Sequence, residues 1–192
     1  MVTALAGAAG EGRGTGLILR ALRFAAWKHR DQRRKGPKQL PYINHPIDLA
    51  DLLWFEGRVR DPVVIAAAIL HDTIEDTDAT PDEIQREFGS EVLGLVLEVT
   101  DDRSLPKEVR KQLQVETAAK KSPRAKLLKL ADKLCNVKDL VESPPADWSM
   151  KRRQEYLDWT EKVVLGMRGS NRELEELYDE VLKRGKQSLG ME

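Results

Sequence analysis

The chain of 192 residues has a single cysteine, Cys135. One cysteine cannot form an internal disulfide, and it cannot supply the paired thiolates of a CxxC metal or redox site. This composition suits a reducing compartment, so we expect a cytoplasmic protein. The start, "MVTALAGAAGEGRGTG", has no basic segment before an apolar one, and it therefore does not resemble a secretory signal.

The sequence also lacks a net charge and a long apolar run. Its 32 lysines and arginines balance 32 aspartates and glutamates, so bulk charge gives no reason to expect binding to nucleic acid or to an anionic membrane. The apolar stretches are far shorter than the ~20 residues that span a bilayer. The chemistry of the protein must therefore come from local clusters of side chains.

From residue 17 onward, apolar residues recur at helical spacings and β-branched runs are few. We predict an all-α protein with a single domain over 17–192, after a mostly disordered lead-in over 1–16. Glycine and proline in "KGPKQLPYINHP" predict a loop or a small hairpin after the first helix. The predicted helices cover about 16–34, 48–56, 62–72, 81–88, 90–100, 106–119, 123–141, 149–168 and 171–186.

The third predicted helix has Asp61 as its N-cap and no polar face between Pro62 and Leu70. A helix without a polar face is expected inside the protein. At its inner end, "ILHDTIEDTD" supplies one histidine and four carboxylates: His71, Asp72, Glu75, Asp76 and Asp78. A solvated acidic turn would explain the carboxylates alone. A histidine beside an aspartate at the end of a buried helix favours a bound cation instead, because unpaired buried charge is costly.

Two further fragments carry candidate ligands. A helical projection of "LLKLADKLCNVKDL" places Asp132 in one sector with Leu128 and Cys135, away from the lysines, which is unusual for a solvated acid. In "LPYINHPID", His45 lies where a loop re-enters a helix, as a ligand or as a structural hydrogen-bonding group. The three fragments together offer two imidazoles and two carboxylates: His45, His71, Asp72 and Asp132. This mixture suits a first-row divalent ion such as Mn²⁺, Fe²⁺, Co²⁺ or Zn²⁺.

The order of the motifs "PYINHP", "ILHDTIEDT" and "LKLADKLCNVKDL" resembles the HD-domain metal-dependent phosphohydrolases. The chain is most similar to the hydrolase domain of the RelA/SpoT family, and within it to the small stand-alone alarmone hydrolases, over about residues 18 to 185. The resemblance implies a compact bundle of about ten helices with a short hairpin. It also implies removal of pyrophosphate from the 3′ position of guanosine tetra- or pentaphosphate. The chain is too short for the synthetase and regulatory domains of the long family members.

The resemblance assigns roles to individual residues. The four candidate ligands match the family's metal ligands, whose usual ion is Mn²⁺, and we expect one divalent ion per chain. Glu75 and Asp76 match the acidic pair of the hydrolysing members, which would act on the attacking water or on the leaving oxygen. The implied or candidate substrate contacts are Arg34, Lys35, Tyr42, Lys107, Asn136, Arg152 and Tyr156. For Lys107 and Arg152 a plain surface role is an equal alternative.

The basic run "KHRDQRRKGPK" gives a separate reason to consider Arg34 and Lys35. The chain must turn from them to His45 within about ten residues, which brings a cation near a metal-bound phosphate. His29 is expected to be packed or to lie behind the ligands. The other cations of the run are expected to be solvated: Arg30, Arg33 and Lys38.

Two alternative functions stay open. One is removal of a phosphate from another ribose position, as in the 2′-phosphate of NADPH. The other is a non-catalytic sensor that binds the alarmone and signals through a partner. The intact acidic pair of Glu75 and Asp76 disfavours the sensor, because binding alone does not need it. The sequence leaves the native metal and the oligomeric state open.

Overall fold

The computed structural model of the protein describes residues 2–191, with side chains described from residue 12 onward. This part of the chain contains ten α-helices, one short 3₁₀ helix and no named β-strand, so the predicted all-α class is confirmed. None of the described helices combines the length and the apolar character that crossing a membrane requires. The helices are α1 (Val2–Lys28), α2 (Asn44–Phe55), α3 (Pro62–Leu70), α4 (Thr73–Asp76), α5 (Pro81–Phe88), α6 (Ser90–Val99), α7 (Lys107–Thr117), η1 (Ala118–Lys120), α8 (Pro123–Glu142), α9 (Met150–Leu165) and α10 (Arg172–Ser188).

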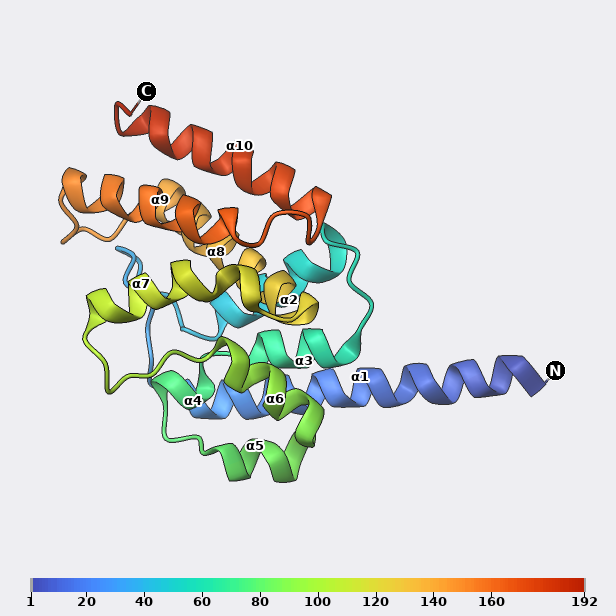
Figure 1. Ribbon diagram of the computed structural model, residues 1–192. Helices are drawn as coiled ribbons and strands as arrows, with labels where there is room; N and C mark the ends of the chain where they lie inside the picture. The colour runs from blue at the N-terminus through green and yellow to red at the C-terminus, as the bar shows by residue number, and fades with distance from the viewer. Residues whose placement is uncertain (1, 192) are drawn as a thin grey trace.

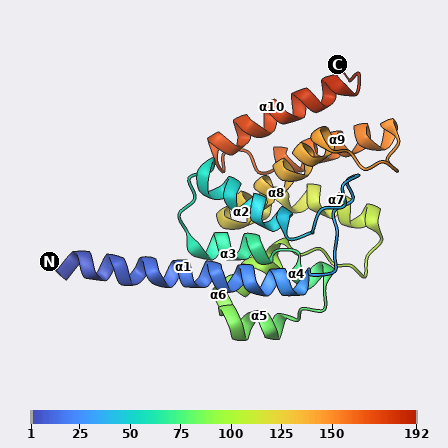
Figure 2. The ribbon, with the colours of Figure 1, turned by 180° about the vertical axis from the view of Figure 1, so that it is seen from behind.

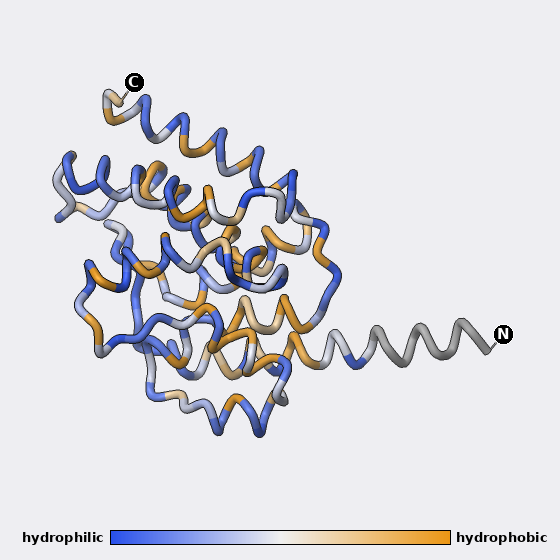
Figure 3. Tube along the Cα trace, viewed as in Figure 1, coloured by the Kyte–Doolittle hydropathy of each residue, from blue (hydrophilic) through white to orange (hydrophobic). Residues whose placement is uncertain are grey.

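Helix α3 lies at the centre of the bundle, as its wholly apolar sequence predicts. Every residue from Val64 to Leu70 is buried, and the helix contacts α1, α2, α6 and α8 (Figures 1 and 2). Its start is fixed by Asp61, whose side chain accepts the backbone N–H of Val63 at 2.9 Å. Figure 3 shows α3 and the adjoining part of α1 among the more hydrophobic segments. The residues that follow Leu70 are therefore held inside the protein.

Helix α8 is the second central helix and contacts α2, α3, α6, α9 and α10. Asp132, only 7% exposed, lies in the buried part of this helix, as the projection predicts. The inference that Asp132 points away from the lysines is wrong, because Lys133 Nζ lies 3.0 Å from Asp132 Oδ2. A lysine has a long flexible stem, so its ammonium can reach a neighbour that a projection of Cα positions assigns to another sector.

The connection between α1 and α2 folds back on itself without forming a regular hairpin. Within residues 2–191 it contains one isolated antiparallel bridge, between Arg33 and Pro41. The backbone N–H of Arg34 donates to the carbonyl of Leu40 at 2.8 Å. Pro41 has no N–H to donate, which limits the extension of the ladder. This fold-back brings Arg34 and Tyr42 toward the start of α2.

The first residues differ from the sequence prediction of a disordered lead-in over 1–16. Helix α1 begins at Val2 and includes residues 12–16, while Met1 lies outside the described residues. A Cβ atom on Gly14 would lie 3.2 Å from Cβ of Pro62, so α1 passes close to the start of α3. This tertiary contact favours helix in a stretch whose glycines disfavour it locally.

Candidate active site

Two turn residues, His71 and Asp72, connect α3 to α4. The carbonyl of Asp72 accepts the backbone N–H of Asp76 at 2.8 Å, so the two carboxylates are one helical turn apart, as predicted. His71 Nδ1 lies 2.7 Å from the carbonyl of Ala68. Because a carbonyl oxygen only accepts, Nδ1 carries a hydrogen and Nε2 is the atom directed at the site. The backbone of α3 thus sets the orientation of the imidazole.

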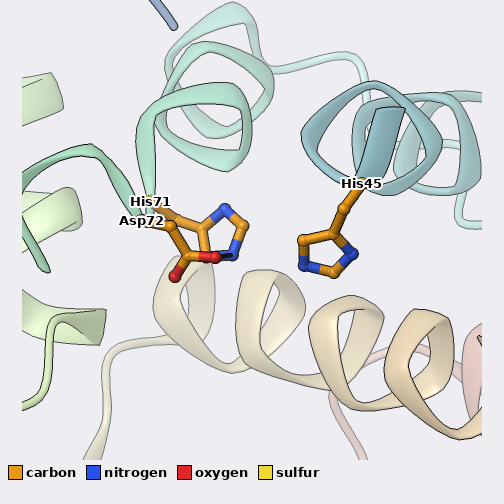
Figure 4. A group of neighbouring side chains, drawn as sticks. All are labelled: His45, His71 and Asp72. Atoms are coloured by element: carbon orange, nitrogen blue, oxygen red, sulfur yellow. Dashed lines mark ion pairs between the residues drawn. The ribbon is translucent and has the colours of Figure 1, made fainter. Parts of the chain in front are cut away.

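The four predicted ligands come together from three parts of the chain. His45, in the first turn of α2, has its Nε2 3.3 Å from Asp132 Oδ1 on α8. His71 Nε2 lies 3.0 Å from Asp72 Oδ2 and 3.9 Å from Asp132 Oδ1. Donor atoms of His45, His71 and Asp72 all lie within 4.8 Å of one another. Figure 4 shows the two imidazoles directed toward each other, with Asp72 beside His71.

The charges of this cluster fit a bound cation. His71 Nε2 is buried and makes no hydrogen bond. Burial opposes a charge on His71, but the carboxylates of Asp72 and Asp132 outweigh burial and raise its pKa to about 9. Burial also opposes ionisation of Asp72, yet neighbouring His71 holds the pKa of that carboxyl well below its usual range. The cluster therefore attracts positive charge, and its donors are those that first-row divalent ions prefer.

Two neighbours orient the carboxylates of the cluster. The hydroxyl of Tyr42 donates a hydrogen bond to Asp72 Oδ2. Burial and the adjacent Asp72 raise the pKa of this phenol, which keeps it a donor. On the other side, Asn136 Nδ2 donates to Asp132 Oδ1 at 2.6 Å, and Lys133 pairs with Oδ2. Partners of this kind fix ligand geometry in metal sites.

The acidic pair lies one turn beyond the cluster, and cations hold it. Glu75 Oε2 accepts the backbone N–H of Asp101 at 3.1 Å, and Glu75 Oε1 lies 3.4 Å from Arg110 Nη1. Asp76 accepts a hydrogen bond from Arg103. Burial raises the pKa of Glu75, the backbone hydrogen bond lowers it, and the negative charge of Asp101 raises it again, with a net rise. Glu75 is therefore a fixed carboxylate with a greater affinity for a proton than a solvated one.

Some of the predicted substrate contacts also lie beside the cluster. Arg34 is paired with Asp139, its Nη2 lies 3.3 Å from Asn136 Oδ1, and its guanidinium stacks 5.6 Å from the ring centre of Tyr42. Because Asn136 in turn bonds Asp132, the cation is two hydrogen bonds from a candidate ligand. The structure thus brings Arg34, Tyr42 and Asn136 together, as predicted.

Aromatic side chains of α9 and its preceding loop connect two more predicted residues to the site. Tyr156 lies between Trp148 and Trp159, with ring centres 5.3 Å from each. Arg152 stacks on Trp148 at 4.3 Å, and the Lys133 ammonium lies 4.8 Å from the ring centre of Trp159. Burial, opposed by Lys133, raises the pKa of Tyr156 to about 12. Lys133 connects these rings to the candidate ligand Asp132, because its ammonium lies near Trp159 and also pairs with Asp132.

The remaining two predicted cations, Lys35 and Lys107, make no side-chain contact with the cluster in the described part of the chain. Lys35 and Lys107 are both exposed, and neither has a side-chain hydrogen bond or ion pair within the described residues. His29 is buried with its Nδ1 2.5 Å from Gln32 Oε1, and its ring lies 4.8 Å from that of Tyr42. It packs behind Tyr42, in agreement with the expectation that it is not a ligand.

Five residues near the site escaped the sequence analysis: Asp101, Arg103, Arg110, Lys129 and Lys133. The loop before α7 and α7 itself supply the first three, and no local pattern links them to Glu75 or Asp76. The two lysines are four residues apart and share one face of α8, which is also the pattern of a solvated helix face, so the sequence does not reveal that they are buried.

Comparison with known proteins identifies the family. The HD domain matches residues 21–158. Relatives from Homo sapiens and Drosophila melanogaster, both named guanosine-3′,5′-bis(diphosphate) 3′-pyrophosphohydrolase MESH1, are 54% and 49% identical over 167 residues, which cover 87% of this chain and 93% of each relative.

A solved structure agrees with these sequence relatives. It is described as a metazoan ortholog of SpoT that hydrolyses ppGpp, and it aligns with a TM-score of 0.86 at 49% identity, over 88% of this chain and 94% of that chain. A family with these members has a divalent metal site, and the cluster of His45, His71 and Asp72 is a possible one here. The chain belongs to the HD-domain family, among the small guanosine-3′,5′-bis(diphosphate) 3′-pyrophosphohydrolases.

Proposed function

We propose that the protein hydrolyses guanosine 3′,5′-bis(diphosphate) at the 3′ position and releases pyrophosphate and GDP, or GTP from the pentaphosphate. The observation that carries the proposal is the position of Glu75. This carboxylate is held by Asp101 and Arg110 one turn from a His/Asp cluster, on a chain about half identical to enzymes named for this activity. A site for binding alone has no use for a fixed, protonatable carboxylate at that position.

His45, His71, Asp72 and Asp132 are the proposed ligands of one divalent ion per chain, with Mn²⁺ as the proposed metal. Two carboxylates beside two imidazoles suit an ion that accepts both oxygen and nitrogen donors. The buried Nε2 of His71 supports this assignment, because it makes no hydrogen bond and faces the carboxylates of Asp72 and Asp132, whose negative charge a cation would neutralise. When bound, a divalent ion supplies Lewis acidity, which polarises a phosphoryl oxygen and lowers the pKa of water.

In the proposed reaction, a water oxygen attacks the phosphorus that is bonded to the ribose 3′ oxygen. The bond between that phosphorus and the 3′ oxygen breaks, and the 3′ oxygen takes up a proton as pyrophosphate leaves. Glu75 accepts the proton of the attacking water, a role that its raised pKa favours. Asp76, paired with Arg103, orients the water or protonates the leaving oxygen. Glu75 is the proposed base because its side chain is more enclosed than that of Asp76, at 17% against 23% exposed.

The proposed substrate contacts surround the cluster. Arg34 and Lys35 bind phosphate, Tyr42 stacks with the nucleotide, and Asn136 contacts it from α8. Arg34 is held by Asp139, so its guanidinium loses little conformational freedom on binding. The residues proposed to meet the distal phosphates or line the same cleft are Lys107, Arg152 and Tyr156.

Two further properties of the chain are proposals. We propose that the hydrolase domain covers 17–192, because helices α2 to α10 and the HD match at 21–158 fall within that range. We propose a cytoplasmic location, because Cys135 is a buried free thiol and the described chain has no disulfide, as in proteins of reducing compartments.

The proposed function is tested by an assay of purified protein with Mn²⁺, in which guanosine tetraphosphate and NADPH are supplied separately and the products are identified. NADPH is the matched competitor because it also carries a phosphorylated ribose beside a purine. We expect a higher kcat/KM for guanosine tetraphosphate, since its two terminal diphosphates offer more charge to the cations than the 2′-phosphate and the bridging diphosphate of NADPH do. A clear preference for NADPH would mean that NADPH, and not guanosine tetraphosphate, is the better substrate. Binding of guanosine tetraphosphate without turnover would favour a sensor.

A further inference from the structure

Asp101 connects three helices at the site, although nothing in the proposed reaction requires its side chain. It lies just after α6, and its backbone N–H donates to Glu75 Oε2 of α4 at 3.1 Å. Its side-chain Oδ2 accepts a hydrogen bond from Gln114 Nε2 of α7 at 2.5 Å. Its Oδ1 lies 3.9 Å from Lys129 Nζ of α8. One residue thus joins the proposed base to the two helices that enclose it.

The partner Lys129 is unusual in being almost wholly buried, with 9% of its side chain exposed. Burial and the nearby Lys133 ammonium lower its pKa, while the carboxylates of Asp101 and Asp132 oppose this effect. An ammonium group in such a position is costly unless a counter-charge lies close by. Asp101 is the acidic partner within ion-pair distance of Lys129. The two charges therefore hold each other in place.

We propose that Asp101, clamped by Lys129 and Gln114, is the positioning residue that fixes the Glu75 carboxylate for proton transfer. This inference rests on the proposed function, in which Glu75 accepts a proton. The loop between α6 and α7 has no regular structure, so the backbone N–H that binds Glu75 depends on side-chain anchors for its position. Lys129 and Gln114 are those anchors. Without them, the N–H and the carboxylate lose their fixed geometry.

The competing explanation is that the Lys129–Asp101 pair only adds stability. The chain offers a matched control, because Lys28 also has 9% of its side chain exposed and pairs with Asp78 and Glu83 at 3.0 Å each. That pair joins α1 to α5 and has no contact with Glu75 or the cluster. Lys28→Met and Lys129→Met therefore each remove an ion-paired ammonium from a side chain that is 9% exposed, and only the second one touches the clamp.

The experiment compares Asp101→Asn, Lys129→Met and Gln114→Leu with Lys28→Met and wild type. For each protein we would measure metal content, thermal midpoint, kcat and KM for guanosine tetraphosphate, and amide hydrogen exchange at residue 101. In the three clamp variants we expect kcat to fall by about 10- to 100-fold with little change in KM or metal content, as for a misplaced catalytic group. Exchange at residue 101 should become faster. Lys28→Met should lower only the thermal midpoint.

Non-additivity gives a second readout that simple loss of stability does not give. If Asp101 and Lys129 act as one unit, the double variant should be no slower than Asp101→Asn alone. Wild-type kcat and unchanged exchange at residue 101 in both Lys129→Met and Gln114→Leu would overturn the proposal. If wild type itself fails to hydrolyse guanosine tetraphosphate, the proposed function fails, whereas the exchange rates still decide whether the clamp exists.

Discussion

His45 Nε2 on α2 and Asp132 Oδ1 on α8 lie 3.3 Å apart. The two residues are far apart in sequence, and they meet because α2 and α8 pack against each other and against α3. The candidate metal site therefore exists only in the folded protein. Because the ligands meet only in the folded protein, an ion that binds them stabilises the folded state over the unfolded one.

Replacing either His71 or Asp72 by alanine should remove the bound metal and the activity together, because each supplies a donor atom to one small cluster. Elemental analysis of purified protein measures the metal per chain. His29→Asn is the matched control, since His29 is buried but bonds Gln32 and packs behind Tyr42. It should keep the metal. Full metal content in both cluster variants would refute the ligand assignment.

Glu75→Gln and Asp76→Asn should keep the metal and lose turnover, because these side chains are proposed to act on water and not on the ion. General acid–base steps typically contribute 10²–10⁴-fold, so kcat should fall by about that factor. Asp78→Asn is the control on the same acidic stretch. Its side chain is 83% exposed and pairs with Lys28, so its kcat should equal that of wild type. Normal turnover in both Glu75 and Asp76 variants would mean that the acidic pair is structural and takes no part in the reaction.

The activity should fall at acidic pH with an apparent pKa above 4.5, the ordinary value for a glutamate. Burial is the main cause of the raised pKa of Glu75, and the charge of Asp101 adds to it. A base must be unprotonated to accept a proton, so kcat/KM declines as pH falls through this raised pKa. A pH profile of kcat/KM measures it. In Glu75→Gln the residual kcat/KM should no longer decline at acidic pH through this pKa. If the decline persisted in this variant, another group would be responsible for it.

Arg34→Ala and Lys35→Ala should raise KM for guanosine tetraphosphate, with metal content unchanged, because each removes a cation proposed to bind phosphate. Raised salt should weaken substrate binding in wild type more than in the double variant, since screening acts on the charges that the variant lacks. Lys38→Ala, an exposed cation from the same run, is the control and should behave as wild type. Wild-type kinetics in the double variant would return Arg34 and Lys35 to a plain surface role.

The elements with strong local signals were predictable. The all-apolar segment up to Leu70 predicts the buried α3, and Asp61 caps this helix as expected. Helix α2 begins at Asn44, earlier than the predicted start near 48, so His45 lies in its first turn and not before it. The first helix also extends further toward the N-terminus than predicted. At Gly14 the close approach of α1 to Pro62 favours helix in spite of the local glycine signal.

The site was predictable where its residues occupy one helical turn or match a motif, as His71, Asp72, Glu75 and Asp76 do. Asp132 was predictable because it stands among apolar neighbours. The contacts of Asp101, Arg103 and Arg110 were not, because they depend on how the loop after α6 returns over α4. Such long-range positions follow from tertiary structure and leave no periodic trace in the sequence.

The most direct measurement follows the products of guanosine tetraphosphate hydrolysis in heavy-oxygen water by phosphorus NMR and mass spectrometry, with metal-loaded wild type and Glu75→Gln side by side. Wild type should release GDP and intact pyrophosphate that carries one heavy oxygen from water, because water attacks the phosphorus beside the ribose 3′ oxygen. Glu75→Gln should give the same products far more slowly. Orthophosphate in place of pyrophosphate, heavy oxygen in the GDP, or no hydrolysis by the metal-loaded wild type would contradict this account.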